Sequence, residues 1–199
     1  MRSRKNELTF RKKKKRITPK VLREIFSWLI ITVLAVVIAT SLVLCFGMKV
    51  SVIGESMEPL CYNTQEVLID RVLCKIVSPG RGDVIVFLPN GNANSHYYVK
   101  RIIAVPGEIV QIIDGNLYIN GEPADEDSDY FDKMEDAGIA DNPIKLESGQ
   151  YFVLGDNRNS SEDSRSANIG IVSGNMIVGK AWFLIGNEAH DGGFLINTY

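Results

Sequence analysis

Residues 97–120 read YYVKRIIAVPGEIVQIIDGNLYIN, and this segment carries the clearest strand signals in the chain. Tyr97–Val105 is a run of aromatic and β-branched residues that ends at Pro106-Gly107, as a strand ends at a turn. Ile109–Ile113 and Asn116–Asn120 flank Asp114-Gly115, a dipeptide that favours a two-residue hairpin turn. The segment therefore predicts one strand followed by an antiparallel hairpin.

Further strands are predicted on both sides of this segment. Short runs rich in Val, Ile and Leu, bounded by Gly, Pro or Asn, are typical of strands. They occupy Val50–Ile53, Glu66–Val72, Asp83–Leu88, Tyr151–Leu154 and Met176–Ile185. No long helical periodicity appears after residue 46, so we expect a mainly β body built as an antiparallel sheet or barrel. Residues 121–149 carry many acids and little periodicity, which indicates a solvated excursion with one short helix.

An uncharged apolar run, Ile25–Phe46, precedes this body. Its 22 residues would form a helix about 33 Å long, which matches a hydrocarbon core of about 30 Å. A buried core helix is disfavoured because no polar face recurs at helical spacing. A cleaved secretory signal is disfavoured because the run is long and no small-x-small site clearly ends it. The run is therefore predicted to be an uncleaved transmembrane anchor.

Charge is distributed unevenly along the chain. Residues 1–24 hold eleven Lys and Arg against two Glu, a net +9, so the remainder carries −11 of the total net charge of −2. The cluster Arg11–Arg16 precedes the apolar run, and only Lys49 closely follows it. The positive-inside rule then predicts a cytoplasmic arm at residues 1–24, an anchor at 25–46 and an extracytoplasmic body at 47–199. The arm could also be interpreted as a nucleic-acid patch, but topology and anionic lipid explain it better beside a membrane span.

The cysteines and histidines give no metal or cofactor signature. Cys45 lies at the end of the apolar run, while Cys61 and Cys74 could pair in an oxidising compartment, a question that the sequence leaves open. His96 and His190 lie far apart, and no CxxC spacing occurs. We therefore predict neither a metal site nor a cofactor.

Ser56 is the first candidate for chemistry. It lies in GESMEP, residues 54–59, ten residues after the apolar run ends. Ten residues span at most about 33–36 Å, so Ser56 would work close to a membrane surface. A serine hydroxyl is a poor nucleophile unless a base accepts its proton. The candidate bases are Lys100, His96, His190 and the carboxylates.

Lys100 is flanked by apolar residues on a predicted strand, where alternation would place Lys100 and Arg101 on opposite faces. If Lys100 points inward, burial disfavours its charged form and lowers its pKa from about 10.4 towards neutrality. The neutral amine could then act as a general base. If Lys100 points outward, it is a solvated lysine without a catalytic role.

A second polar segment follows the predicted strand Tyr151–Leu154. It reads GDNRNSSEDSR, residues 155–165, and is too polar to be core. Asp and Arg at this density can fold a loop through charge-assisted hydrogen bonds. From the residues alone, Asp163 and Arg165 are best interpreted as parts of a well-bonded structural turn.

Together these segments resemble the bacterial type I signal peptidases. The resemblance covers most of the predicted outer body, in the blocks Gly54–Arg71, Tyr98–Glu108, Gly149–Arg165 and Gly179–Phe183. Two motifs are highly specific: KRIIAVPGE at residues 100–108 and the segment 155–165. The resemblance implies a membrane-bound serine endopeptidase that removes signal peptides from exported preproteins. It also implies a β-rich catalytic core with a smaller inserted β subdomain, which we expect at about residues 107–149.

The resemblance further implies roles for single residues. Ser56 matches the family's nucleophile, whose backbone N–H would hold the oxyanion, and Lys100 matches its general base. Ser161 matches the serine whose hydroxyl helps orient the lysine. Asp163 and Arg165 match residues that hold the site together rather than react.

Substrate positions and partners follow from the same resemblance. Met57, Tyr98 and Val99 match positions near the pockets that select small residues before the scissile bond. The substrate would bind extended and add a strand at a sheet edge. The implied partners are exported preproteins and the lipid bilayer, with the export translocon as a further candidate and with no nucleic acid.

The sequence departs from the family near the substrate pocket and the oxyanion site. Leu60 stands where the motif usually has Thr, and Cys61 where a larger apolar residue is common. Gly54 stands where some members have a serine that donates to the oxyanion. Gly54 has no side-chain donor, so a second oxyanion donor must come from elsewhere.

Other functions stay open as alternatives. A self-cleaving repressor with the same dyad would need a DNA-binding domain, and residues 1–24 are too short for one. A relative with a histidine base would need His where Lys100 stands, and His96 lies at the wrong place on the strand. A membrane-anchored β module that binds export machinery or lipid needs no dyad, and it predicts that Ser56→Ala leaves function intact.

Overall fold

The computed structural model describes residues 18–89, 96–124 and 130–195. The chain divides into two compact units, Met1–Ser41 and Leu42–Tyr199, and each is described by itself. Most of the basic arm predicted at residues 1–24 lies outside the described residues, so its cytoplasmic location stays a prediction.

The helix α1 (Pro19–Phe46) has 28 residues and contains the predicted apolar run. Proline suits its first position because the fixed φ and the missing N–H cost nothing there. Within the run, Thr32 and Thr40 donate their hydroxyls to the carbonyls of Trp28 and Val36, so these polar groups are satisfied inside the helix. None of its residues is buried, which argues against a core helix, and α1 is long and apolar enough to cross a membrane.

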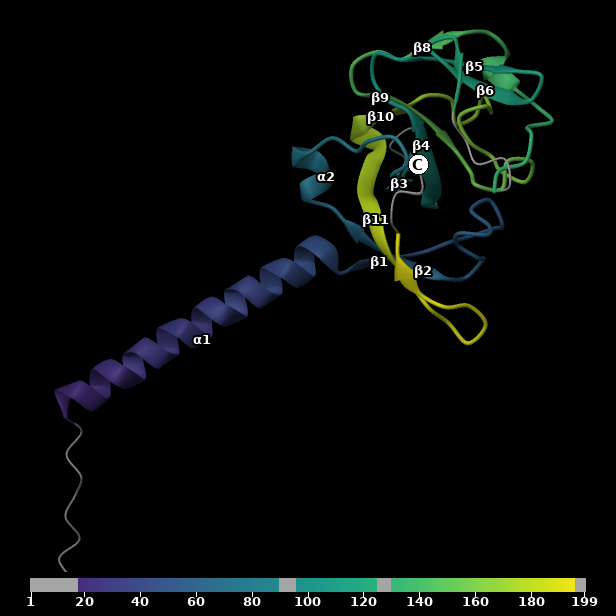
Figure 1. Cartoon of the computed structure of the whole chain (residues 1–199). Helices are drawn as coiled ribbons and strands as arrows, with labels where there is room; N and C mark the ends of the chain where they lie inside the picture. Colours follow the sequence, from purple (N-terminus) through teal and green to yellow (C-terminus); the bar gives the residue numbers. More distant parts are fainter. Residues whose placement is uncertain (1–17, 90–95, 125–129, 196–199) are drawn as a thin grey trace, which may run out of the picture. The chain divides into compact units, whose positions relative to one another are not determined.

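The body is built on an eight-stranded sheet (Figure 1) in which all neighbouring strands are antiparallel. The strand order is β1-β2-β11-β3-β4-β9-β10, and β12 pairs with β11. These strands are β1 (Met48–Ser51), β2 (Glu66–Asp70), β3 (Val84–Phe87), β4 (Tyr98–Ala104), β9 (Gln150–Leu154), β10 (Val172–Ser173), β11 (Ile177–Ile185) and β12 (Gly193–Phe194). The prediction of a mainly β body is confirmed.

The inserted segment forms a smaller sheet of four strands, in the order β7-β6-β5-β8. These strands are β5 (Ile109–Ile113), β6 (Asn116–Ile119), β7 (Glu122–Pro123) and β8 (Ile144–Lys145). The turn between β5 and β6 has positive φ at both Asp114 and Gly115, 49° and 75°, as a two-residue hairpin turn requires. Buried residues of this sheet share one apolar cluster with Phe152 and Leu154, so the insert packs on the main sheet.

The acidic segment after β6 is less solvated than its composition indicated. Phe131, Met134, Ala140 and Leu146 are buried, and the last three join the cluster beneath the small sheet. The interpretation of residues 121–149 as a solvated excursion was therefore wrong for these positions, because scattered apolar residues reach the core without any periodicity. Residues 125–129 lie outside the described chain.

Each predicted strand is present, with ends displaced by two residues or fewer. The elements that the sequence did not indicate are short: the two-residue strands β7, β8, β10 and β12, the helix α2 (Leu73–Ile76) and the 3-10 turn η3 (Gly174–Met176). A second 3-10 turn, η2 (Gly138–Asp141), is the short helix expected in the insert. Elements of two to four residues are too short to show a hydrophobic period.

Candidate active site

A cleft lies between two extended segments of the body. Residues 52–56, which follow β1, form one wall, and residues 96–100, which include the start of β4, form the other. Ser160 and Glu162, from the loop after β9, complete the lining of a cavity of about 200 Å³. Ser56 and Lys100, the predicted nucleophile and base, both line this cleft.

β4 has an unpaired edge beside this cleft. Its residues Tyr98–Arg101 pair with β3, whereas the pairing with β9 on the other edge starts only at Arg101. Within the described part of the chain, Tyr98–Lys100 therefore have no strand on that edge. An extended peptide can hydrogen-bond to such an edge.

The backbone around Ser56 is held by contacts on both sides. The Ser56 carbonyl accepts a hydrogen bond from the Asn157 N–H at 3.1 Å. Gly54 has a φ of 86°, a conformation that costs glycine little, and its N–H donates to Asn63 Oδ1 at 3.0 Å. Gly54 therefore helps to shape the turn, but its N–H is already engaged and it offers no side-chain donor for an oxyanion.

β4 lies in the interior of the sheet, and both of its faces are covered. Lys100 is 3% exposed and Arg101 is 1% exposed. Alternation along the strand directs Lys100 to Ser56 and Arg101 to Asp156. Of the two orientations of Lys100 that the sequence left open, the structure has the inward one.

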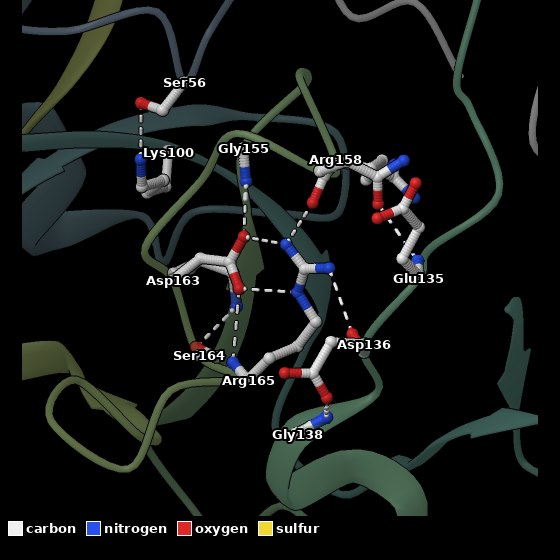
Figure 2. A network of polar contacts seen from close by, with 12 residues as sticks. Ser56, Lys100, Glu135, Asp136, Gly138, Gly155, Arg158, Asp163, Ser164 and Arg165 are labelled. Atoms are coloured by element: carbon white, nitrogen blue, oxygen red, sulfur yellow. Dashed lines mark hydrogen bonds and ion pairs between the residues drawn. The ribbon is translucent and has the colours of Figure 1, made fainter.

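Lys100 Nζ and Ser56 Oγ are hydrogen-bonded at 2.5 Å, as Figure 2 shows. Burial of the amine lowers the pKa of Lys100 from 10.5 to about 8, although the carboxylates of Asp163 and Glu162 oppose this shift. A useful fraction of the amine is therefore neutral near pH 8. In that form the hydroxyl can donate its hydrogen bond to the nitrogen, the geometry required for general-base catalysis.

Arg101 and Asp156 form a buried ion pair that ties β4 to the 155–165 loop. Arg101 Nε donates to Asp156 Oδ1 at 2.8 Å, and Nη2 donates to Oδ2 at 2.6 Å. Arg101 Nη1 also donates to the Gly82 carbonyl at 2.9 Å. Each side chain is only 1% exposed, so this bidentate pair is shielded from water.

Asp156→Ala is expected to lower the free energy of unfolding by about 3–5 kcal/mol, because Arg101 would keep a buried charge without its carboxylate. Urea unfolding of the protein in detergent, followed by near-UV circular dichroism, measures this loss. The matched control is Glu66→Ala, which breaks the exposed Lys49–Glu66 pair and should cost less than about 1 kcal/mol. Equal losses of unfolding free energy in the two variants would contradict the argument that burial makes the Arg101–Asp156 pair more important.

A second buried pair, Asp163–Arg165, organises the 155–165 loop (Figure 2). Arg165 Nε and Nη2 donate to the two carboxylate oxygens of Asp163, each at 2.9 Å, and the Gly155 N–H donates to Oδ2 at 3.2 Å. Arg165 also donates to the carbonyls of Arg158 and Asp136. The pair thus links both ends of the loop to the inserted segment.

Ser161 lies close to Gly155, whose Cβ position also borders the Ser56 backbone. Its hydroxyl oxygen is buried and has no hydrogen-bond partner in the described chain. Ser161 lines a neighbouring cavity of about 320 Å³, together with Arg158 and Arg165. A Cβ on Gly155 would collide with both Ser161 Oγ and the Ser56 carbonyl oxygen, so only glycine fits here without a shift of its neighbours. The role of Ser161 in orienting Lys100 stays a prediction.

Gly155→Ala is expected to lower kcat/KM by about 100-fold, because the new methyl group must displace the Ser56 backbone, and a shift of about 1 Å can cost that much. Steady-state cleavage of a peptide substrate measures the loss. Gly193→Ala is the matched control, since a Cβ at Gly193 meets no atom within 4 Å. Wild-type activity in Gly155→Ala would show that the close packing at this glycine is not required.

The predicted substrate-binding residues are separated by the fold. Tyr98 and Val99 line the cleft. Met57 is fully buried in an apolar cluster with Val50 and Val52 and does not line the cleft. The roles of all three in substrate binding stay predictions.

Glu162 is a cleft residue that sequence analysis missed. Its carboxylate accepts hydrogen bonds from the Tyr98 hydroxyl at 3.3 Å and from Asn168 Nδ2 at 3.2 Å. The signal that could have found it is its place between Ser161 and Asp163 in the specific 155–165 motif. A single exposed acid is more often just a solvated surface residue, so composition alone gives no reason to select it.

The three cysteines are free thiols, so Cys61 and Cys74 are not bonded to each other in this structure. Cys61 is buried, and burial, assisted by the Asp156 carboxylate, raises the pKa of its thiol to about 12. A thiol in this state is inert. Across residues 18–89, 96–124 and 130–195, no group of three or more His, Cys, Asp or Glu is placed to hold a metal.

Comparison with known proteins identifies the class of enzyme. The chain matches the family model for signal peptidase, peptidase S26, over residues 25–185, which is more than half of its length. It is therefore a serine endopeptidase, a hydrolase of peptide bonds. The chain belongs to the signal peptidase family, whose members cleave signal peptides.

Individual relatives match most of the chain. Signal peptidase I S of Bacillus subtilis (strain 168) is 34% identical over 173 residues, 81% of this chain and 89% of the relative. Signal peptidase I T of the same strain is 36% identical over 139 residues, 66% of this chain and 69% of the relative. A crystal structure of a signal peptidase I from Enterococcus faecalis V583 is 33% identical, with a TM-score of 0.40, and the match covers 52% of this chain and 97% of that chain.

Proposed function

We propose that this chain is a membrane-anchored signal peptidase I that cleaves exported preproteins with a Ser56–Lys100 dyad. One observation carries the proposal: Ser56 Oγ and Lys100 Nζ are hydrogen-bonded at 2.5 Å, and burial lowers the pKa of this lysine to about 8. An ordinary surface lysine, with a pKa of about 10.4, would be charged near pH 8 and could not accept a proton.

The reaction follows from this geometry in two stages. Neutral Lys100 accepts the proton of Ser56 as Oγ attacks the scissile carbonyl carbon, and the Ser56 backbone N–H stabilises the oxyanion. The lysine ammonium then gives its proton to the leaving amine, which frees the mature protein and leaves the signal peptide as an ester on Ser56. In the second stage Lys100 accepts a proton from water as the water oxygen attacks the ester carbonyl carbon. The lysine ammonium then returns this proton to Ser56 Oγ as the ester bond breaks, which frees Ser56 and neutral Lys100, and the product acid ionises to a carboxylate.

The cleft supports an extended substrate. The unpaired edge of β4 at Tyr98–Lys100 can hydrogen-bond to a peptide backbone, and Val99 and Tyr98 lie where its side chains would pass. The Asp163–Arg165 pair would hold the loop that contacts Ser56, and Ser161 would orient Lys100 from the same loop. Tyr98, Val99 and Met57 are proposed to shape the pockets for small residues.

The proposed topology places the reaction at the extracytoplasmic surface of the cell membrane. Residues 1–24 would be cytoplasmic, 25–46 would span the bilayer, and 47–199 would form the outer catalytic domain with its insert at about 107–149. The exposed apolar surface of α1 supports the span, and β1 begins two residues after α1 ends. Since a signal peptide also remains in the bilayer, anchoring both partners raises their effective concentration.

Cleavage of a preprotein by the purified full chain in lipid vesicles tests the proposal. The wild type should release a mature protein with a new N-terminus, which mass spectrometry identifies, and Ser56→Ala should not. Release by both proteins at the same rate would contradict the dyad.

A further inference from the structure

The wall of the Ser56 cleft carries an oriented negative charge at Glu162. Tyr98 and Asn168 donate to the two different oxygens of its carboxylate, at 3.3 and 3.2 Å. The Tyr98 ring is itself stacked on His96, with ring centroids 4.8 Å apart. The carboxylate is exposed, but these contacts restrict where its charge can lie.

Glu55 adds a second carboxylate to the lining of the cleft. It directly precedes Ser56, it is exposed, and it lines the same cleft as Glu162. Lys100 also lines the cleft, but the reaction requires it in the neutral form. In the working state of the enzyme, the two carboxylates therefore give the cleft a net negative charge.

A substrate bound in the cleft passes both carboxylates, because both residues line it. The unpaired edge of β4 fixes the line of an extended peptide, and the reach of Ser56 Oγ fixes the position of the scissile bond along it. Side chains of an extended peptide alternate, so those nearest the scissile bond approach the walls at set positions. A charged side chain there meets Glu162 or Glu55 in a partly desolvated cleft, where like charges repel.

We infer that Glu162, together with Glu55, selects substrates by charge, favouring a Lys or Arg side chain close to the scissile bond over an Asp or Glu. The inference rests on the proposed function of the cleft and adds a substrate class to it: preproteins with a basic residue beside the cleavage site. Glu162 acts here as a specificity-determining residue and does not react with the substrate, although its carboxylate also raises the pKa of Lys100.

The test uses the full-length enzyme in detergent at low ionic strength, with peptides that differ at one position. Lys, Gln or Glu is placed at the second residue before the scissile bond, or at the first or second residue after it. The wild type should cleave the Lys peptide with about tenfold higher kcat/KM than the Glu peptide at one or more of these positions. Glu162→Gln should reduce that ratio to about threefold or less, and Glu162→Lys should invert it.

The ratio of kcat/KM for the Lys peptide to kcat/KM for the Glu peptide isolates substrate selection from the chemistry, because Ser56 and Lys100 cleave both peptides. Glu147→Gln is the matched control: Glu147 is an exposed acid outside the cleft, so the wild-type ratio should be kept. A Lys-to-Glu ratio near one at all three positions, or a wild-type ratio in Glu162→Gln, overturns the inference and leaves the dyad intact. Failure of the wild type to cleave any of the peptides in a Ser56-dependent way would overturn the proposed function as well.

Discussion

Ser56→Ala is expected to lower kcat for preprotein cleavage by about 10³-fold or more, because the covalent bond to the signal peptide forms at Ser56 Oγ. The alanine variant keeps the backbone N–H, the strand edge and the buried Lys100, so substrate binding should change little. The loss should therefore appear in kcat rather than in KM. Single-turnover cleavage of a labelled preprotein in vesicles, resolved by gel electrophoresis, measures it.

The control for this experiment is another serine with the same chemical change. Ser148 is exposed in the loop before β9 and away from the cleft, so Ser148→Ala should cleave at the wild-type rate. Thermal unfolding of both variants should match the wild type, since neither change empties the core. Full activity in Ser56→Ala would instead favour the alternative of an anchored β module that binds export machinery or lipid without catalysis.

Local signals in the sequence were enough to place the strands of four or more residues. Asp114-Gly115 predicted its hairpin because the turn requires positive φ at both residues, which is a property of the dipeptide itself. The order of strands could not be predicted in the same way. β11 lies between β2 and β3, although about a hundred residues separate β11 from them in the chain. Such pairing depends on the packing of the whole core, so no local sequence pattern indicates it.

In the candidate site, too, local motifs indicated the residues, whereas contacts between distant residues could not be predicted. The motifs brought Ser56, Lys100 and the 155–165 loop to attention, but alternation alone could not orient Lys100. Both Lys100 and its neighbour Arg101 are buried, because β4 is covered on both faces and each side chain has a hydrogen-bond partner. Glu162 lies inside the 155–165 motif, but only the structure shows that its carboxylate accepts a hydrogen bond from Tyr98 at the cleft.

Cleavage by the wild type is expected to depend on the protonation of Lys100. Only the neutral amine accepts the Ser56 proton, and burial places the pKa of Lys100 at about 8. The charged groups around it act in both directions: Asp163, Glu162 and Asp156 raise this pKa, and Arg165 lowers it. Below pH 8 the neutral fraction falls, so kcat/KM should drop about tenfold for each pH unit, and above pH 8 it should reach a plateau.

The measurement is kcat/KM for a peptide substrate between pH 6 and pH 10 at constant ionic strength. A flat profile over this range would contradict the assignment of Lys100 as the base. Lys100→Met is the companion variant, because methionine keeps an unbranched apolar side chain but has no amine. It should be inactive at every pH, while its thermal stability should be no lower than that of the wild type, since burial disfavours the ammonium that the change removes. Lys100→Arg should also be inactive throughout, because a guanidinium stays protonated up to pH 10 and cannot accept the proton.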